Sequence, residues 1–269
     1  MIVSNFELLV KRIANPQVAL PPNVTSVFRR VVQGYFLIIS NLETTRTIRL
    51  SLKLTITSSI NNREINSDNT VCFFDNGNTD NRELQINRST SSNYTEYNTQ
   101  FFDLGPKETG IITILPNVTG NTPANPLVSS DMEVRGYAEL RQIRIFKGIR
   151  SIFKEVPEAN ILTNPEIRGT FLDNAFPSNN GADELDFDQI AYSLPTASGK
   201  LANIVESVPP LIISNGFLNA SFDLEVAQKQ LMIDNPNYTE KEMMEVSKML
   251  QDLKNDDQIL DIAKKLKRK

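Results

Sequence analysis

Strict alternation of apolar and polar residues over residues 46–57 constrains the fold more than any other feature of the sequence. Every second position is apolar: Ile48, Leu50, Leu52, Leu54 and Ile56. Successive side chains of a β-strand point to opposite faces, so this period of two predicts a strand with one face in a core and the other in water. We therefore expect Leu52 and Leu54 to be buried, and Arg49 and Lys53 to be exposed.

Other segments of the chain favour strands as well. Residues 31–39 are almost continuously apolar, which is typical of a strand covered on both faces. Further candidate strands are residues 71–74, 84–86, 110–115, 132–146, 168–172, 189–194 and 211–213. Several short strands separated by turn residues predict a mainly β chain, here an antiparallel β-sandwich over residues 21–222, of which the jelly roll is one form.

The N-terminal residues 1–20 are expected to form an amphipathic arm that carries a short helix over residues 4–14. Ser4 and Glu7 have the spacing of a capping box. On a helix, four apolar side chains would share one face: Phe6, Leu9, Val10 and Ile13. A helix this short is marginally stable alone, so its apolar face needs a partner.

Residues 223–269 differ from the rest in composition and are expected to form a charged helical segment. From residue 225 to the last residue, 18 of 45 residues are charged, against 42 in the first 224. Thr239 and Glu242 have the spacing of a second capping box. The apolar stripe of the helix that follows would consist of Met243, Val246, Leu250 and Leu253.

These two terminal stripes are the candidate subunit contacts. An apolar stripe left in water loses the free energy that burial would supply, so each stripe must pack against its own domain or a neighbouring subunit. Methionine side chains adapt well to partner surfaces. We therefore expect a homo-oligomer or a larger assembly in which Phe6, Leu9, Val10, Ile13, Met243, Val246, Leu250 and Leu253 contribute to the contacts.

Composition excludes most catalytic chemistry. The chain contains no histidine and one cysteine, so neither Ser-His-Asp nor Cys-His catalysis can be assembled, and neither can a Cys/His zinc site. Cys72 lies within an apolar run, which predicts a buried and unreactive thiol. We therefore expect a chain that is not an enzyme and that needs no cofactor.

One acidic cluster has the oxygen-rich character of a calcium site. It comprises Asp183, Glu184, Asp186 and Asp188. Calcium prefers carboxylate ligands, but the spacing does not match an EF-hand, and a solvated acidic loop explains the cluster equally well.

A basic run could contact nucleic acid or could form ion pairs with the acids among it. The run comprises Arg135, Arg141, Arg144, Lys147, Arg150 and Lys154, with Glu133, Glu139 and Glu155 interspersed. The net charge of −4 does not suit a polyanion-binding protein. A cross-strand ion-pair ladder is therefore the favoured interpretation, and nucleic acid is not the favoured partner.

The function that survives these exclusions is a soluble, non-enzymatic structural or assembly subunit, of the shell, capsid, fibre or appendage type. The alternative is a ligand-binding β-sandwich module that recognises carbohydrate or a calcium-linked surface, and an enzyme that uses only carboxylates is a third class. No stretch is apolar enough to span a bilayer, and the first residues do not resemble a signal peptide. This predicts synthesis in the cytoplasm, followed by incorporation into a particle or appendage.

Overall fold

The structure is a computed structural model, and it describes residues 1–12, 29–57, 64–77, 81–90, 94–118, 126, 132–145, 155–173, 189–207 and 244. The chain divides into two compact units. One contains Met1–Arg141 and Ala159–Val205, and the other contains Gln142–Glu158 and Glu206–Lys269.

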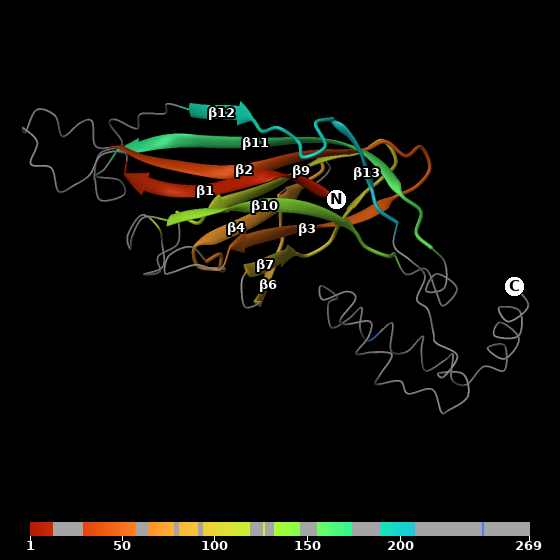
Figure 1. Cartoon of the computed structure of the whole chain (residues 1–269), viewed down its shortest axis with the longest axis horizontal. Coiled ribbons are helices and arrows are strands. Elements are labelled where there is room, and N and C mark those ends of the chain that lie inside the picture. The colour runs from red at the N-terminus through yellow and green to blue at the C-terminus, as the bar shows by residue number, and fades with distance from the viewer. Residues whose placement is uncertain are drawn as a thin grey trace, which may run out of the picture. The chain divides into compact units, whose positions relative to one another are not determined.

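Thirteen strands make up the regular structure of the described residues, and they join into one antiparallel sheet (Figure 1). They are β1 (Ile2–Arg12), β2 (Arg29–Asn41), β3 (Ile48–Thr57), β4 (Thr70–Asp75), β5 (Arg82–Glu83), β6 (Ile86–Thr90), β7 (Tyr94–Thr99), β8 (Phe102–Leu104), β9 (Thr109–Pro116), β10 (Met132–Gln142), β11 (Ala159–Asp173), β12 (Gln189–Ser193) and β13 (Ala202–Val205). The prediction of a mainly β, antiparallel chain is confirmed.

The sheet curls until its two ends meet. The strand order is β5-β4-β9-β2-β1-β10-β3-β7-β6, with β8 paired to β3, and β11 paired to β2, β12 and β13. The first and last strands of this path, β5 and β6, are neighbouring parts of one segment. Between them the Leu84 N–H donates to the Cys72 carbonyl on β4, and the Gln100 N–H donates to the Gln85 carbonyl.

Strand β2 changes partner along one of its edges, and Gly34 marks the change. Residues 30–33 pair with β1, whereas residues 35–40 pair with β9. A Cβ atom at Gly34 would lie 2.4 Å from Leu115 Cδ2 and 2.6 Å from the Ile114 carbonyl oxygen. Only a residue without a side chain allows β9 to approach β2 this closely.

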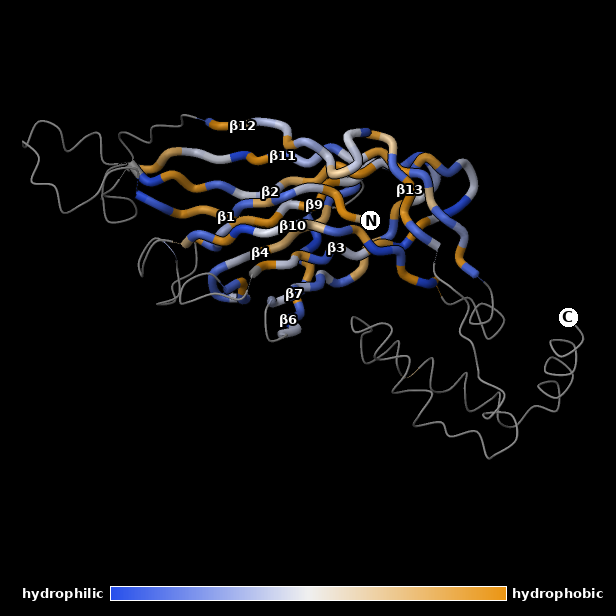
Figure 2. The backbone as a smooth tube through the Cα atoms, viewed as in Figure 1, coloured by the Kyte–Doolittle hydropathy of each residue, from blue (hydrophilic) through white to orange (hydrophobic). Residues whose placement is uncertain are grey.

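The concave side of the curled sheet holds the core. Inward side chains of strands distant in sequence meet there, as in the pair Phe74 and Phe102, with ring centroids 4.6 Å apart. Tyr35 contacts Phe6 edge-on, and its hydroxyl is 2.9 Å from Ser4 Oγ. Figure 2 shows hydrophobic and hydrophilic stretches following one another along β1, β2 and β11.

The prediction of an N-terminal helix is wrong, because residues 2–12 form strand β1 between β10 and β2. Phe6, Leu8 and Val10 alternate on the buried side, and Ser4 bonds to Tyr35 instead of capping a helix. The apolar residues of this segment fit both a helical stripe and a strand. Two strands with free edges supply more hydrogen bonds and burial than a marginal helix can.

The prediction for residues 46–57 is confirmed on one face only. Leu52 and Leu54 are fully buried. Lys53, however, is 6% exposed and Arg49 is half-buried, so the prediction that these two side chains are exposed is wrong.

The outcome for the remaining segments depends on where the structure describes the chain. Strand β12 coincides with the candidate at 189–194, and β11 contains the candidate at 168–172. Residues 211–213 and, apart from Met244, residues 223–269 lie outside the described residues, so the charged helical segment stays a prediction.

Candidate interaction surface

Outward positions on one part of the sheet carry mainly apolar side chains, although this side faces away from the core. We call this set the apolar outer face. It comprises Val71 and Phe73 on β4, Ile111 and Leu115 on β9, Phe36 and Ile38 on β2, Leu162 on β11, and Ala202 and Ile204 on β13. Leu162 is 39% exposed and Ile204 is 54% exposed, while the members on β4, β9 and β2 are half-buried.

Strand register brings these side chains together. Val71 lies opposite Leu115, and Ile111 lies opposite Ile38. Leu162 lies opposite Ala202 on β13 and is two residues along β11 from Asn160, which faces Ile204. Residues opposite one another in an antiparallel pair project on the same side, so the members on β4, β9 and β2 share one side of the sheet with those on β11 and β13. The residues of β11 opposite Phe36 and Ile38 are Glu166 and Asn164, so polar side chains separate the two groups.

The charges beside the apolar outer face neutralise one another. Arg168 pairs with Glu166 on the same strand at 2.7 Å, and its guanidinium lies over the Phe36 ring at 4.8 Å from the centroid. The Asn164 side-chain amide donates to the other oxygen of Glu166. These polar residues lie opposite Gly34, Phe36 and Ile38 of β2 and add no net charge to this side of the sheet.

Outward positions on β1, β10, β3 and β7 carry charges instead. We call this set the charged outer face. It comprises Glu7, Lys11, Lys53, Glu96, Glu133, Arg135, Glu139 and Arg141. Arg135 pairs with both Glu7 and Glu133, and Lys11 pairs with Glu133 at 2.8 Å. Arg135 and Arg141 of the predicted basic run thus pair with acids on β1 and β10, as an ion-pair ladder requires.

Lys53 is the most buried member of the charged outer face. Its ammonium lies 2.6 Å from Glu139 and 3.0 Å from Glu96, and its side chain is 8% exposed. Burial by itself lowers the pKa of Lys53, but the hydrogen bonds that its ammonium donates to Glu139 and Glu96 outweigh this effect and leave the pKa above its ordinary value. Burial by itself raises the pKa of Glu139, but the hydrogen bond and charge of Lys53, with the charge of Arg141, hold it below its ordinary value.

Uncharged polar groups beside Lys53 are buried without a hydrogen-bond partner in the described structure. They are Ser51 Oγ, Thr55 Oγ1 and Asn98 Oδ1. Asn98 lies opposite Lys53 in the pairing of β3 with β7. Buried polar groups in proteins are usually satisfied by protein or ordered water, so this part of β3 and β7 retains hydrogen-bonding capacity.

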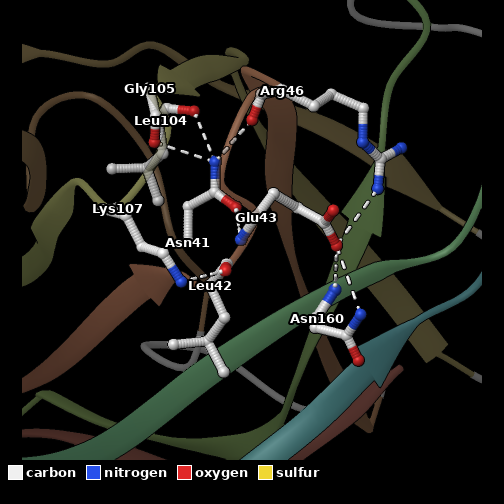
Figure 3. A network of polar contacts seen from close by, with 8 residues as sticks. All are labelled: Asn41, Leu42, Glu43, Arg46, Leu104, Gly105, Lys107 and Asn160. Carbon is white, nitrogen blue, oxygen red and sulfur yellow. Dashed lines mark hydrogen bonds and ion pairs between the residues drawn. The ribbon is translucent and has the colours of Figure 1, made fainter.

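A polar network ties β2 to β8 and β11 at one end of the sheet (Figure 3). The buried Asn41 amide donates to the carbonyl oxygens of Arg46, Leu104 and Gly105, and its oxygen accepts from the Glu43 N–H. The Glu43 carboxylate accepts from both the backbone and the side chain of Asn160. The backbone bond from Asn160 is the main cause that lowers the Glu43 pKa. Because the Asn41 groups are satisfied within the chain, we assign this network a structural role.

The structure places the predicted subunit-contact residues differently from the sequence interpretation. Phe6 and Val10 are 3% and 1% exposed in the core of their own chain, and Leu9 is half-buried on β1. The remaining candidates, Ile13, Met243, Val246, Leu250 and Leu253, lie outside the described residues.

The candidate calcium ligands cannot be placed in the same way. Asp183, Glu184, Asp186 and Asp188 lie outside the described residues. Within the residues that the structure does describe, no three or more Asp, Glu, Cys or His side chains are arranged to hold a metal ion. The described part of the chain also contains no helix with the length and apolar character needed to cross a membrane.

The sequence pattern behind the apolar outer face fits two structures, a strand covered on both faces and a strand with an apolar outward side. The continuous apolar run at 31–39 predicts a strand covered on both faces, yet Phe36 and Ile38 are only half-buried. Leu162 and Ile204 lie 42 residues apart in the sequence, and only the pairing of β11 with β13 makes them neighbours.

No protein-family model matches the chain, and no curated protein matches it either. Its structural neighbours include a viral chemokine binding protein encoded by rodent gammaherpesvirus Peru, at 9% identity and a TM-score of 0.22. That match covers 71% of this chain and 63% of the viral protein, so the chain spans less than two thirds of its length. Another is AvmM, which catalyses macrocyclization in alchivemycin A biosynthesis, at 11% identity and a TM-score of 0.15, with 70% and 88% of the two chains covered. Both TM-scores are too low to carry an argument about fold or function.

Proposed function

We propose that the chain is a non-enzymatic structural or assembly subunit that associates with its partners through the apolar outer face. We further propose that the curled sheet is a β-sandwich of the jelly-roll type, with a charged helical segment at residues 223–269. The observation that supports association is the number of outward apolar side chains on β4, β9, β2, β11 and β13, with Leu162 and Ile204 the most exposed of them.

Burial of this face would favour association. Complete burial of a large aliphatic or aromatic side chain contributes roughly 1.5–3 kcal/mol. The members on β4, β9 and β2 are already half-buried, so their remaining contribution is smaller, whereas Leu162 and Ile204 retain about half of theirs. Contiguous outward apolar side chains with a polar border are typical of protein–protein contacts.

The experiment compares the mass in solution of the full-length chain with that of a Leu162→Asp, Ile204→Asp double variant. We expect the full-length chain to self-associate at micromolar concentration, and the double variant to form smaller particles with an unchanged melting temperature. A matched control is Asn5→Asp, which adds a carboxylate at an exposed position of β1 and should leave the mass unchanged. A full-length chain that stays monomeric at high concentration, or a double variant that assembles normally, would contradict the proposal.

One observation supports the second candidate function, a ligand-binding module. Ser51 Oγ, Thr55 Oγ1 and Asn98 Oδ1 have hydrogen-bonding capacity to spare beside an ammonium and two carboxylates. All three atoms are buried, so a small polyhydroxy ligand would reach them only after this part of β3 and β7 opens. A thermal-shift screen with mono- and disaccharides tests this candidate, and no stabilisation by any sugar at millimolar concentration would remove it.

A further inference from the structure

Strand β12 forms an outer edge of the sheet. Residues 189–193 pair antiparallel with residues 166–170 of β11 along one edge. No strand in the described part of the chain pairs with its other edge. The free edge therefore has backbone donors and acceptors available for another strand.

The hydrogen-bond pattern identifies which residues point to that free edge. The Leu194 N–H donates to the Pro165 carbonyl of β11 at 2.8 Å. In an antiparallel pair, alternate residues direct their backbone groups to the same neighbour. Residues 190 and 192 therefore also bond toward β11, and the N–H and C=O groups of Gln189, Ala191 and Ser193 point away from it.

The composition of β12 suits pairing with a strand of identical sequence. Its residues are Gln189, Ile190, Ala191, Tyr192 and Ser193, with no charge and no proline. A twofold axis brings like charges together, so an uncharged edge avoids the repulsion that charges on edge strands normally supply. Strand β6, by contrast, carries Arg88, which pairs with Glu64 at 2.6 Å.

We propose that β12 pairs antiparallel with β12 of a second copy of this chain, about a twofold axis at Ala191. This register is the longest available, because it places Gln189 opposite Ser193 at both ends and joins all the outward-pointing backbone groups. It also places Ile190 opposite Tyr192 of the second copy, a cross-strand pair of the favourable β-branched and aromatic kind. Tyr192 is 45% exposed in the single chain, so this pair has side-chain surface to cover.

This inference rests on the proposed function, because it names the partner in one of the contacts of the assembly. The two Ala191 Cα atoms would lie about 5.5 Å apart, which is within the range that a disulfide bridges. The native Cys72 is 1% exposed and does not compete for cross-linking.

The experiment is disulfide cross-linking of an Ala191→Cys variant of the full chain under mild oxidation. We expect a covalent dimer as the main product. The matched control is Ala197→Cys, an alanine that is likewise exposed but lies in the turn between β12 and β13, outside both outer faces, and it should give less than a tenth as much dimer. Equal cross-linking of the two variants, or no cross-linking of Ala191→Cys, would overturn the inference. The absence of cross-linking is also the result expected if residues 174–188 of the same chain occupy the edge.

Two further variants separate edge pairing from loss of folding. Ala191→Pro removes only an N–H that points away from β11, and Ala191→Lys places a charge on the twofold axis. Both should keep the melting temperature of the native chain and lose the β12-mediated contact, seen as a halved mass or a smaller particle. An unchanged mass in both variants would contradict edge pairing.

The two proposals fail in distinguishable ways. If Leu162→Asp with Ile204→Asp reduces the mass but Ala191→Cys does not cross-link, the edge inference fails and the apolar outer face stands. If Ala191→Cys cross-links but the double aspartate variant assembles normally, the apolar outer face fails and edge pairing stands.

Discussion

The apolar outer face and the charged outer face belong to the same curled sheet and cover the same core, yet their outward positions are occupied in opposite ways. On β10 and β1 the outward residues pair acid with base, as Arg135 does with Glu7 and Glu133. On β2 and β9 the corresponding positions hold Ile38 and Ile111 side by side. Charged outward residues form ion pairs within the chain and hydrogen bonds with water. Outward apolar residues contribute a favourable free energy of burial only when a partner covers them. The comparison indicates that the two faces differ in their need for a partner.

The largest expected effect comes from a change beneath both faces. Leu52→Asp would bury an unpaired carboxylate in the core that the two faces share. We expect a loss of more than about 4 kcal/mol in the free energy of unfolding, enough to leave the chain unfolded or insoluble. Circular dichroism and thermal unfolding measure this, and a soluble variant with the native melting temperature would show that β3 does not face the core with Leu52.

A smaller effect is expected where the charged outer face is most buried. Glu139→Ala removes the closer of the two carboxylates that neutralise Lys53 and leaves only Glu96 beside a buried ammonium. Because Glu139 is one fifth exposed and Glu96 remains, the cost should be about 2 kcal/mol, below that of breaking a fully buried pair.

The matched control for this change is Glu133→Ala. Its partners Lys11 and Arg135 are largely exposed, so the loss should stay within about 0.5 kcal/mol. Denaturant unfolding of the two variants checks the comparison, and equal losses would show that burial does not distinguish Lys53 from the exposed pairs.

Acid should weaken the same cluster. The folded-state pKa of Glu139 lies below its ordinary value of 4.5, so the folded chain binds this proton less readily than the unfolded chain does. Its contribution to stability is therefore fully present above pH 4.5 and is lost as the pH falls through the lower folded-state pKa. Unfolding measured between pH 3 and 7 should show this loss in the native chain, and Glu139→Gln or Lys53→Met should reduce it. If both variants lost stability in acid to the same extent as the native chain, this result would contradict the role of the Lys53–Glu139 pair.

The smallest expected effect is on Cys72, an inward residue of β4 beneath the apolar outer face. Burial, with a smaller contribution from the charge of Glu83, raises the pKa of the Cys72 thiol to about 12. Only the thiolate reacts, so a thiol reagent at pH 8 should leave the native chain unlabelled and react after denaturation. Mass spectrometry after timed exposure checks this, and rapid native labelling would show that this side of the sheet opens readily.

Local pattern was sufficient to predict part of this molecule. The alternation at residues 46–57 predicted the strand and the burial of Leu52 and Leu54, and the apolar run around Cys72 predicted its burial. Strand β12 was expected at nearly the bounds it has. These features depend on side-chain direction along one strand, which the period of two determines wherever one side of a strand is buried.

Long-range pairing decided the rest. Residues 2–12 form a strand because β10 and β2 offer free edges, which a local capping pattern at Ser4 and Glu7 cannot reveal. Lys53 is buried because β10 and β7 bring Glu139 and Glu96 beside it. The members of the apolar outer face share one side because sheet order places β11 beside β2 and β13 beside β11. The sequence by itself determined which residues alternate and which types of chemistry the chain lacks. Only the tertiary structure determined which strands became neighbours, because β-pairing joins residues far apart in the sequence and a strand's own pattern does not specify its partner.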